Sequence, residues 1–504
     1  MTPPRRTPSA ARELSGPAKL EEVTELLGKL KVDLAQTNLF PPRALHSSSN
    51  PFTPLSDEAN LSSERNTILE QLKVHGRDLD NADPIVSKEV RKHLIFSSNS
   101  PTTSREALRC LANALFLKPE TRQVFVDLSY APKAAERLKG ENRDDEFLVS
   151  RVLFLTTYDT NLNFERLIDE HHLAEHINAR IAQHSRQYSK SVRKIQTSAQ
   201  DDAALAETLK LIFNITHYYP DRAHVFSRSI PHILKILTRR KLPNLPLQSP
   251  ICYLINALMN LDLEDKKNIY FGVNPLFPKF DQKCNADRLI NILDSAVERY
   301  SEAELDQVGA PLTTLLRRVY EIAPEGVKRY MQWLLLPSDD ERGQPIGKSD
   351  TLASRLLRLS TSPLAPALRE NISSLFFELS DKDATSFVQN VGYGFAAGFL
   401  LTHNLPIPEN AKEAWSTAGG GTAGDTTNGT RKVDQINPVT GQRLSAESSE
   451  TLPEMTQAEK EREAERLFVL FERLKKTGIV NVQNPVEMAV QEGRFEELAD
   501  DAED

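Results

Sequence analysis

The sequence predicts an all-α protein built as an armadillo/HEAT-like α-solenoid superhelix, followed by a flexible linker and a C-terminal amphipathic helix. Apolar residues recur at spacings of three and four along most of the chain, whereas the period-two alternation typical of strands is scarce. A weak internal repeat also recurs roughly every 40 to 60 residues, around and above the armadillo/HEAT range. These two observations favour stacked helical hairpins over a mixed or all-β fold.

The first amphipathic helix is expected at residues 18–36, after a disordered N-terminus at residues 1–16. The apolar residues of this helix fall on one face: Leu20, Val23, Leu26, Leu27, Leu30 and Leu34. Residues 38–60 are rich in Pro and Ser and are expected to form a linker, with helix resuming from about Leu61. The solenoid as a whole is expected to span residues 17–406.

The internal repeat consists mostly of an apolar helix, a polar break and a second amphipathic helix. It occurs at residues 107–127, 147–173, 204–234, 250–262, 311–335 and 368–392. One such hairpin cannot cover its own apolar face, whereas neighbours in a row bury a continuous core. Asn113, Asn214 and Asn256 occupy comparable places in three of these segments. Each asparagine is either satisfied within the solenoid or hydrogen-bonds a segment that lies along the concave groove.

Beyond the solenoid, the sequence predicts a Gly/Thr-rich flexible linker at 407–451, a C-terminal helical segment at 452–493 and an acidic tail at 494–504. Thr456 and Glu459 form a capping box at the start of that helix. Its apolar stripe consists of Ala464, Leu467, Phe468, Phe471 and Leu474. An isolated helix is marginal in water, so this one is expected to dock on its own solenoid or on a partner. Residues 392–406 are rich in Gly and Ala and predict a helix that packs closely against a neighbour.

The composition argues against several classes of protein. A formal net charge of -8, without a dense Lys/Arg stripe, argues against a nucleic-acid binder. Cys110, Cys252 and Cys284 are far apart and form no CxxC pair, which favours a reducing compartment over a disulfide framework. No secretory signal is recognisable, and no segment approaches 18 uninterrupted apolar residues. We therefore expect a monomeric cytoplasmic protein without an integral membrane segment.

Two motifs resemble a nucleotide-binding site and a metal site, but neither has the complete pattern. The stretch 343–349, GQPIGKS, has three residues between its glycines where a nucleotide-binding P-loop needs four, and no buried strand precedes it. In HHLAEH, His172 and His176 flank Glu175 in the order of an inverted metalloprotease motif, but no third ligand stands out. A solvated or partly buried helix face is the favoured interpretation of these histidines. The sequence therefore indicates no catalytic residue, no metal site and no cofactor.

Three stretches in the C-terminal third, GYGFAAGFL, INPVTG and EMTQAEKEREAERLFVLFERLKKTGIV, resemble the synembryn family in content and order. LRCLANALF and RVLFLTTYD are similar to the solenoid core of that family, so the likeness extends over about residues 100–490 and suggests a divergent, fungal-type member. The resemblance implies a guanine-nucleotide exchange factor and folding chaperone for heterotrimeric G-protein α subunits (Gα). Such a protein performs no covalent chemistry, binds nucleotide-free or GDP-bound Gα, releases it on GTP binding, and can be recruited to the plasma membrane through Gα.

In that family the solenoid holds the C-terminal helix of Gα in its groove, and the C-terminal helical segment embraces the nucleotide-binding domain. Carried over to this chain, the resemblance implies groove contacts at Asn113, Arg151 and Phe154 and a second contact at Leu467, Phe468 and Phe471; the repeat pattern adds Asn214 and Asn256.

One feature departs from the family. Animal members carry an acidic Ser/Thr-rich tract before NPVTG, and here the corresponding stretch is far less acidic, so that only Thr422 suits an acidophilic kinase. A passive armadillo-type scaffold, which binds peptide motifs without exchange activity, shares every repeat feature and is the alternative function.

Overall fold

The computed structural model describes residues 16–36, 55–78, 80, 83–86, 101–189, 197–264, 273–406, 408, 436–437, 440–446, 462, 465–466 and 468–469. Within these residues the protein is all-α, and its β-type pairing is limited to one isolated bridge between Ile436 and Arg443. The chain divides into two compact units, residues 1–444 and 445–504, and the contacts below lie within the first unit. No helix in the described ranges combines the length and the apolar character that a bilayer crossing requires.

The α-helices are α1 (Pro17–Gln36), α2 (Leu55–His75), α4 (Pro101–Leu117), α5 (Glu120–Asp127), α6 (Ala131–Arg137), α7 (Arg143–Leu155), α8 (Phe164–His171), α9 (Leu173–Arg186), α10 (Ala199–Tyr218), α11 (Ile230–Arg239), α12 (Ile251–Asn260), α13 (Cys284–Arg299), α14 (Glu302–Val308), α15 (Ala310–Ile322), α16 (Glu325–Leu335), α17 (Leu352–Leu359), α18 (Pro366–Leu379), α19 (Ala384–Val391) and α20 (Tyr393–Thr402). The 3₁₀ segments are η1 (Asp83–Val86), η2 (Pro220–Ser229), η3 (Asp340–Gly343) and η4 (Leu444–Ala446).

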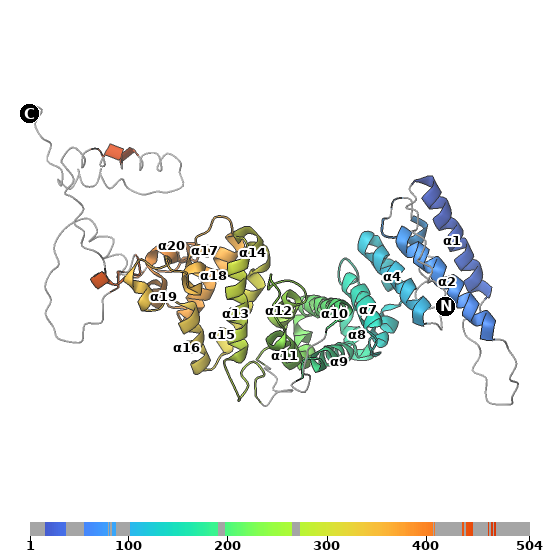
Figure 1. The fold of residues 1–504 in the computed structure, drawn as a ribbon, viewed down its shortest axis with the longest axis horizontal. Coiled ribbons are helices and arrows are strands. Elements are labelled where there is room, and N and C mark those ends of the chain that lie inside the picture. Colours follow the sequence, from blue (N-terminus) through green and yellow to red (C-terminus); the bar gives the residue numbers. More distant parts are fainter. Residues whose placement is uncertain are drawn as a thin grey trace, which may run out of the picture. The chain divides into compact units, whose positions relative to one another are not determined.

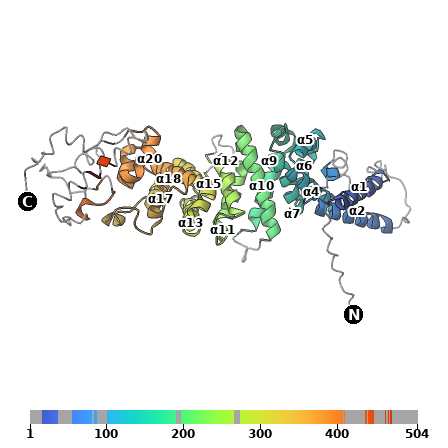
Figure 2. The same ribbon diagram turned by 90° about the horizontal axis from the view of Figure 1, so that it is seen from above.

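The helices pack in two rows that follow the chain. In the first row α2, α4, α7, α10, α12, α15 and α18 each contact the next, and Figures 1 and 2 show these helices succeeding one another in chain order. In the second row α6, α9, α11, α13 and α16 do the same. Contacts of α9 with α10, α11 with α12, and α13 with α15 join the rows. A single cluster of buried apolar side chains runs between them from Leu108 to Leu400.

Local sequence explains where the central helices begin. The side chain of Asn142 accepts hydrogen bonds from the backbone N–H groups of Asp144 and Asp145 and so caps α7. Ser198 and Asp201 form a capping box at the start of α10. Such caps satisfy N–H groups that have no partner inside the helix, and they fix the helix starts on which the site described below depends.

The first predicted helix is confirmed as α1, with Val23, Leu26, Leu27 and Leu30 buried, although Leu20 is exposed. The predicted linker at 38–60 is too long, because α2 already begins at Leu55, directly after Pro54. The repeat segments contain the expected helix pairs, for example α4 with α5 and α15 with α16.

The Gly/Ala-rich stretch at 392–406 differs from its prediction. Gly392 has a φ of 74° and separates α19 from α20, so it lies outside the helix. A methyl group added at Gly398 would meet nothing within 4 Å. The prediction of close backbone approach is therefore wrong at Gly398, whereas Ala396 is fully buried as expected.

The NPVTG motif packs against the GQPIGKS loop. The guanidinium of Arg342, at the start of that loop, is buried and donates a hydrogen bond of 3.0 Å to the carbonyl oxygen of Gly441. The Ile346 N–H donates to the Thr440 carbonyl oxygen at 3.3 Å, and Gly441 has a φ of 68°. A Cβ at Gly441 would lie only 2.6 Å from Ile346 Cδ1, so glycine is required there. This contact lies within the stretch that we predict as a linker.

Candidate binding face

Four successive helices of the first row, α4, α7, α10 and α12, bring aromatic and charged side chains together. Arg151 of α7 contacts several members of this cluster. Its guanidinium carbon lies 5.6 Å from the ring centroid of Phe116 on α4 and 5.9 Å from that of Phe147. Its Nη1 atom lies 3.5 Å from Glu207 Oε1 on α10. Cation–π contacts of this kind are worth about 0.5–2 kcal/mol, depending on how far the cation is desolvated.

Lys210 of α10 likewise contacts several members of the cluster. Its ammonium group pairs with Glu207 Oε1 at 2.9 Å. The same Nζ atom lies 5.7 Å from the ring centroid of Phe154 on α7 and 4.9 Å from that of Tyr253 on α12. Side-chain contacts therefore continue from Phe116 through Arg151, Glu207 and Lys210 to Tyr253. We call the surface formed by Asn113, Phe116, Phe147, Arg151, Phe154, Glu207, Lys210, Asn214, Tyr253 and Asn256 the polar–aromatic face.

Helical spacing explains why these residues meet. On each helix the members lie three or four residues apart, the spacing that places side chains on one side. Of the five predicted groove residues, Arg151 and Phe154 take part in these contacts. Asn113, Asn214 and Asn256 lie three or four residues from Phe116, Lys210 and Tyr253 on the same helices, and their place in a groove stays a prediction. Sequence reasoning missed Phe116, Phe147, Glu207, Lys210 and Tyr253. Steps of three and four from the predicted residues would have identified them.

The asparagines of the face are not equivalent. Asn214 is buried and donates a hydrogen bond of 2.7 Å to Thr157 Oγ1, so part of its hydrogen-bonding capacity is used within the protein. Asn113 and Asn256 are half-buried, and neither side chain makes a hydrogen bond within the described parts of the chain. An amide that is not engaged internally can bond an incoming backbone, because it offers both a donor and an acceptor.

Exposure gives the face its capacity to bind. The side chain of Phe116 is 56% exposed, although a phenylalanine on a monomer surface is normally covered. The Arg151 side chain is 31% exposed, whereas that of Glu207 is only 6% exposed. Half-covered aromatic and arginine side chains are the types that dominate binding energy at protein interfaces. The arrangement therefore suits a bound polypeptide segment that offers both apolar side chains and an anionic group.

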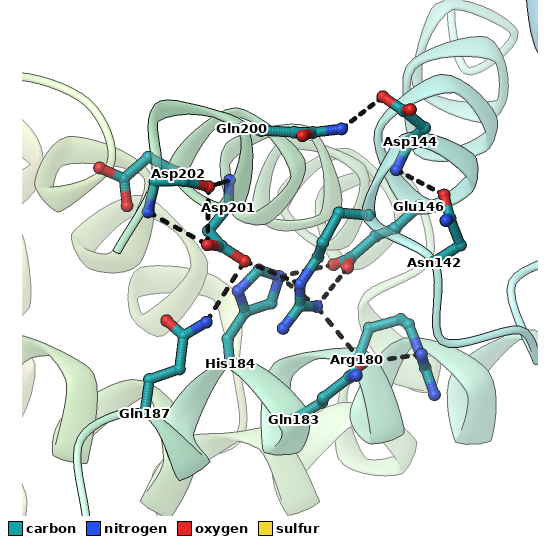
Figure 3. Close-up of polar contacts among 12 residues, drawn as sticks. Asn142, Asp144, Glu146, Arg180, Gln183, His184, Gln187, Gln200, Asp201 and Asp202 are labelled. Carbon is teal, nitrogen blue, oxygen red and sulfur yellow. Dashed lines mark hydrogen bonds and ion pairs between the residues drawn. The ribbon is translucent and has the colours of Figure 1, made fainter. Parts of the chain in front are cut away.

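A separate polar cluster lies at the N-terminal ends of α7 and α10. Figure 3 shows its side chains, with Glu146 of α7, His184 of α9 and Asp201 of α10 pointing toward one another. Arg143 pairs with Glu146 Oε2 at 2.7 Å and with Asp201 Oδ1 at 2.9 Å. His184 Nε2 and the Thr208 hydroxyl donate to Glu146 Oε1 at 2.9 and 3.0 Å.

Burial alone would raise the pKa of the Glu146 carboxyl, but hydrogen bonds and charges from His184 and Arg143 outweigh it and lower the pKa. Glu146 and His184 are both almost fully buried. This buried cluster joins three helices, and we assign it to the framework rather than to the site. The sequence gives no periodic signal for it, because its partners come from three separate segments.

The two motifs that suggest chemistry have structural explanations. His172 has a φ of 52° and precedes α9, which begins at Leu173, so the two histidines do not share a regular helix. The ring of His176 contacts the carbonyl oxygen of Ala135 at 3.0 Å. In the P-loop-like stretch, Ser349 donates a hydrogen bond to Glu341 at 2.7 Å, and that carboxylate would repel a phosphate.

The structure describes only part of the predicted C-terminal contact. Phe468 is helical and 41% exposed. Leu467, Phe471 and Thr422 lie outside the described residues.

The helical fold and the polar–aromatic face together suit a protein that binds another polypeptide. Residues 68–494 match the family described as guanine nucleotide exchange factor synembryn, Ric8, and the chain belongs to this family. A synembryn-like chaperone of Schizosaccharomyces pombe is 25% identical over 89% of this chain and 87% of its own length. Chaperone Ric-8A of Macaca fascicularis is 23% identical over 83% of this chain and 82% of its own, and that of Xenopus tropicalis 25% over 79% and 76%. The family comprises exchange factors and chaperones, not enzymes that make or break covalent bonds.

Proposed function

We propose that this chain is a guanine-nucleotide exchange factor and folding chaperone for Gα that binds the nucleotide-free state and releases it on GTP binding. The observation that carries the proposal is the polar–aromatic face, which spans four successive helices of a chain that belongs to the synembryn family. The two rows of helices support an armadillo/HEAT-like solenoid, in which the first row supplies a continuous binding surface.

The chemistry of the face suits the C-terminal helix of Gα. A terminal helix ends in an α-carboxylate, for which Arg151 and Lys210 are the cations available on the face. Apolar side chains of such a helix can pack on Phe116 and Phe154. Asn113 and Asn256 then provide the polar contacts that fix its register.

Exchange follows from thermodynamic linkage and needs no catalytic side chain. A protein that binds nucleotide-free Gα more tightly than the loaded form must weaken nucleotide binding by the same factor. A preference of about 4 kcal/mol corresponds to roughly a thousandfold in nucleotide affinity. Holding the open nucleotide domain would also keep Gα from aggregating, so exchange and chaperone activity can share one surface.

The decisive experiment measures complex formation with Gα in the absence and presence of GTP, together with uptake of a fluorescent GTP analogue by Gα. We expect a stable complex only without GTP, and faster uptake when this protein is added. Asn113→Ala should weaken the complex without unfolding the protein. If Gα binds equally well in loaded and empty states, the protein is a passive scaffold and the proposal fails.

The C-terminal segment is proposed to make the second contact with Gα, through Leu467, Phe468 and Phe471. A helix tethered by a linker reaches its target at high effective concentration, which strengthens the complex beyond the first contact. Deletion of residues 452–504 should therefore reduce chaperone output more than it reduces binding of an isolated Gα tail peptide. Equal loss of both would show that the segment only stabilises the rest of the chain.

A further inference from the structure

A groove with no role in the proposed function lies between α11, α13 and the loop at residues 273–283. Its volume is about 790 Å³, within the usual range for ligand-binding clefts. Its apolar lining comes from the side chains of Pro231, Leu234, Pro275, Pro278 and Phe280. None of its lining residues belongs to α4, α7, α10 or α12, so the groove is separate from the polar–aromatic face.

Three basic side chains, Lys235, Arg239 and Arg288, line this groove. None of them forms an ion pair with a carboxylate among the residues that the structure describes. Lys235 donates to the Ser189 hydroxyl at 3.1 Å, and Arg288 donates to the carbonyl oxygen of Leu237 at 2.9 Å. These acceptors are neutral, and the one carboxylate that acts on Arg288 is that of Asp287, so the lining holds three positive charges and one negative charge.

The one carboxylate in the lining, Asp287, is already engaged. It accepts hydrogen bonds from the Tyr330 hydroxyl at 2.6 Å and from the Asn291 amide at 2.9 Å. The groove therefore combines an apolar lining with an excess of positive charge. A ligand with one apolar group and two or three carboxylates would complement both features, since the half-buried Lys235 and Arg288 and the exposed Arg239 can each pair with a carboxylate.

One exposed aromatic side chain lines the groove, and a second lies beside Tyr330, which donates a hydrogen bond to Asp287 of the lining. Phe280 is 84% exposed, and Trp333 on α16 is 70% exposed. The Trp333 ring lies 6.0 Å from that of Tyr330, over which the Lys283 ammonium group sits at 4.7 Å. Large exposed aromatic residues next to a cleft are typical of interaction surfaces, because contact of their apolar area with water is unfavourable and a bound partner can bury that area.

We propose that this groove is a second docking site, for an acidic segment of a partner protein that inserts one apolar side chain beside Phe280. Carboxylates on either side of that anchor pair with Lys235, Arg239 and Arg288. A concave cleft favours a peptide over a bilayer, because a flat lipid surface cannot reach its lining. The site acts independently of the polar–aromatic face, so its failure would leave the proposed exchange activity untouched.

The test uses the full chain and a fluorescein-labelled nonapeptide with a central Leu-Phe pair flanked by Glu and Asp. We expect saturable binding by fluorescence anisotropy. The double variant Lys235→Glu and Arg239→Glu should weaken it at least about tenfold and Phe280→Ala about threefold to tenfold, as expected for central interface residues. Arg166→Glu and Leu364→Ala, which alter exposed residues elsewhere, should bind the peptide normally.

A second readout is independent of affinity. Cys284 lines the groove and Cys252 lies on α12, so alkylation of both thiols by N-ethylmaleimide can be followed by peptide mapping. Bound peptide should slow modification of Cys284 and leave Cys252 unchanged. Binding that is insensitive to the three substitutions, or absent, overturns the proposal. So does selective binding to phosphatidylserine vesicles through Phe280 and Arg239, because it would assign the surface to a membrane.

Discussion

Helices α7 and α10 carry charged side chains in two contrasting settings. At their N-terminal ends, Glu146 is buried and accepts hydrogen bonds from Arg143, His184 and Thr208. About one turn further along α7, Arg151 is partly exposed, lies beside an exposed phenylalanine and contacts one carboxylate at 3.5 Å. The comparison shows that charge alone does not mark a binding site. The polar–aromatic face differs because Arg151 is partly exposed and is only partly neutralised by its one carboxylate neighbour.

The energetic roles of the two settings also differ. A buried ion pair adds little net stability compared with an apolar replacement, but removal of one partner strands the other and is strongly destabilising. A partly exposed cation has lost less hydration, so its removal changes stability less. It can then contribute to a complex, where a ligand completes its desolvation and supplies the missing partner.

The largest effect is expected for Glu146→Ala. This change leaves the buried His184 without its carboxylate and removes one of the two carboxylates that pair with Arg143, and it should lower the free energy of unfolding by about 3–5 kcal/mol. Urea denaturation followed by circular dichroism provides the measurement. Glu170→Ala removes a comparable pair with Arg166 at the surface and should change stability by less than about 1 kcal/mol. Similar losses in both variants would contradict the division into framework and face.

The converse is expected for Arg151→Glu. It should weaken the Gα complex about a hundredfold, near 2.7 kcal/mol, because it removes a cation from the centre of the face and repels a terminal carboxylate. Stability should fall by only about 1 kcal/mol, since the side chain is partly exposed and its one ion pair is long. Binding of Gα by calorimetry and urea denaturation measure the two quantities. The matched control is Arg166→Glu on α8, which lies outside the face. Normal binding by Arg151→Glu would remove Arg151 from the site.

Much of the fold follows from the sequence, because one regular pattern specifies it. Spacings of three and four located α1 correctly and placed helix pairs in the repeat segments. The errors lie at the ends of helices. α2 starts at Leu55, earlier than predicted, and the positive φ of Gly392 places that residue before α20, outside the helix predicted at 392–406. Composition gives no warning of such local backbone choices.

The candidate site could be found only in part. Asn113 and Asn256 stand out because they recur at comparable places in the repeat. Lys210 and Tyr253 can be recognised as site residues only once α7, α10 and α12 are packed together, since their contacts join residues that are far apart in the sequence. The buried cluster around Glu146 is harder still to foresee, because a charged residue is normally expected at the surface.

Acid should weaken the framework through Glu146. The pKa of Glu146 is lower in the folded protein than its ordinary value of 4.5, so its contribution to stability is complete above that pH and is lost as the pH falls through the folded pKa. One such group contributes a slope of at most about 1.4 kcal/mol per pH unit. In Glu146→Gln this slope should disappear. Denaturation between about pH 6 and pH 3 tests the effect, and parallel curves for both proteins would contradict it.

The smallest effects separate the two asparagines. Asn214→Ala removes a buried hydrogen bond to Thr157 and should lower stability by about 1 kcal/mol, with a similar secondary loss in Gα affinity. Asn256→Ala breaks no hydrogen bond within the described residues, so stability should change by less than about 0.5 kcal/mol while Gα affinity falls severalfold. Thermal unfolding and Gα titration of both variants provide the measurement. If Asn256→Ala proves the more destabilising variant and binds Gα normally, the amide of Asn256 stabilises the fold. Asn256 would then not belong to the polar–aromatic face.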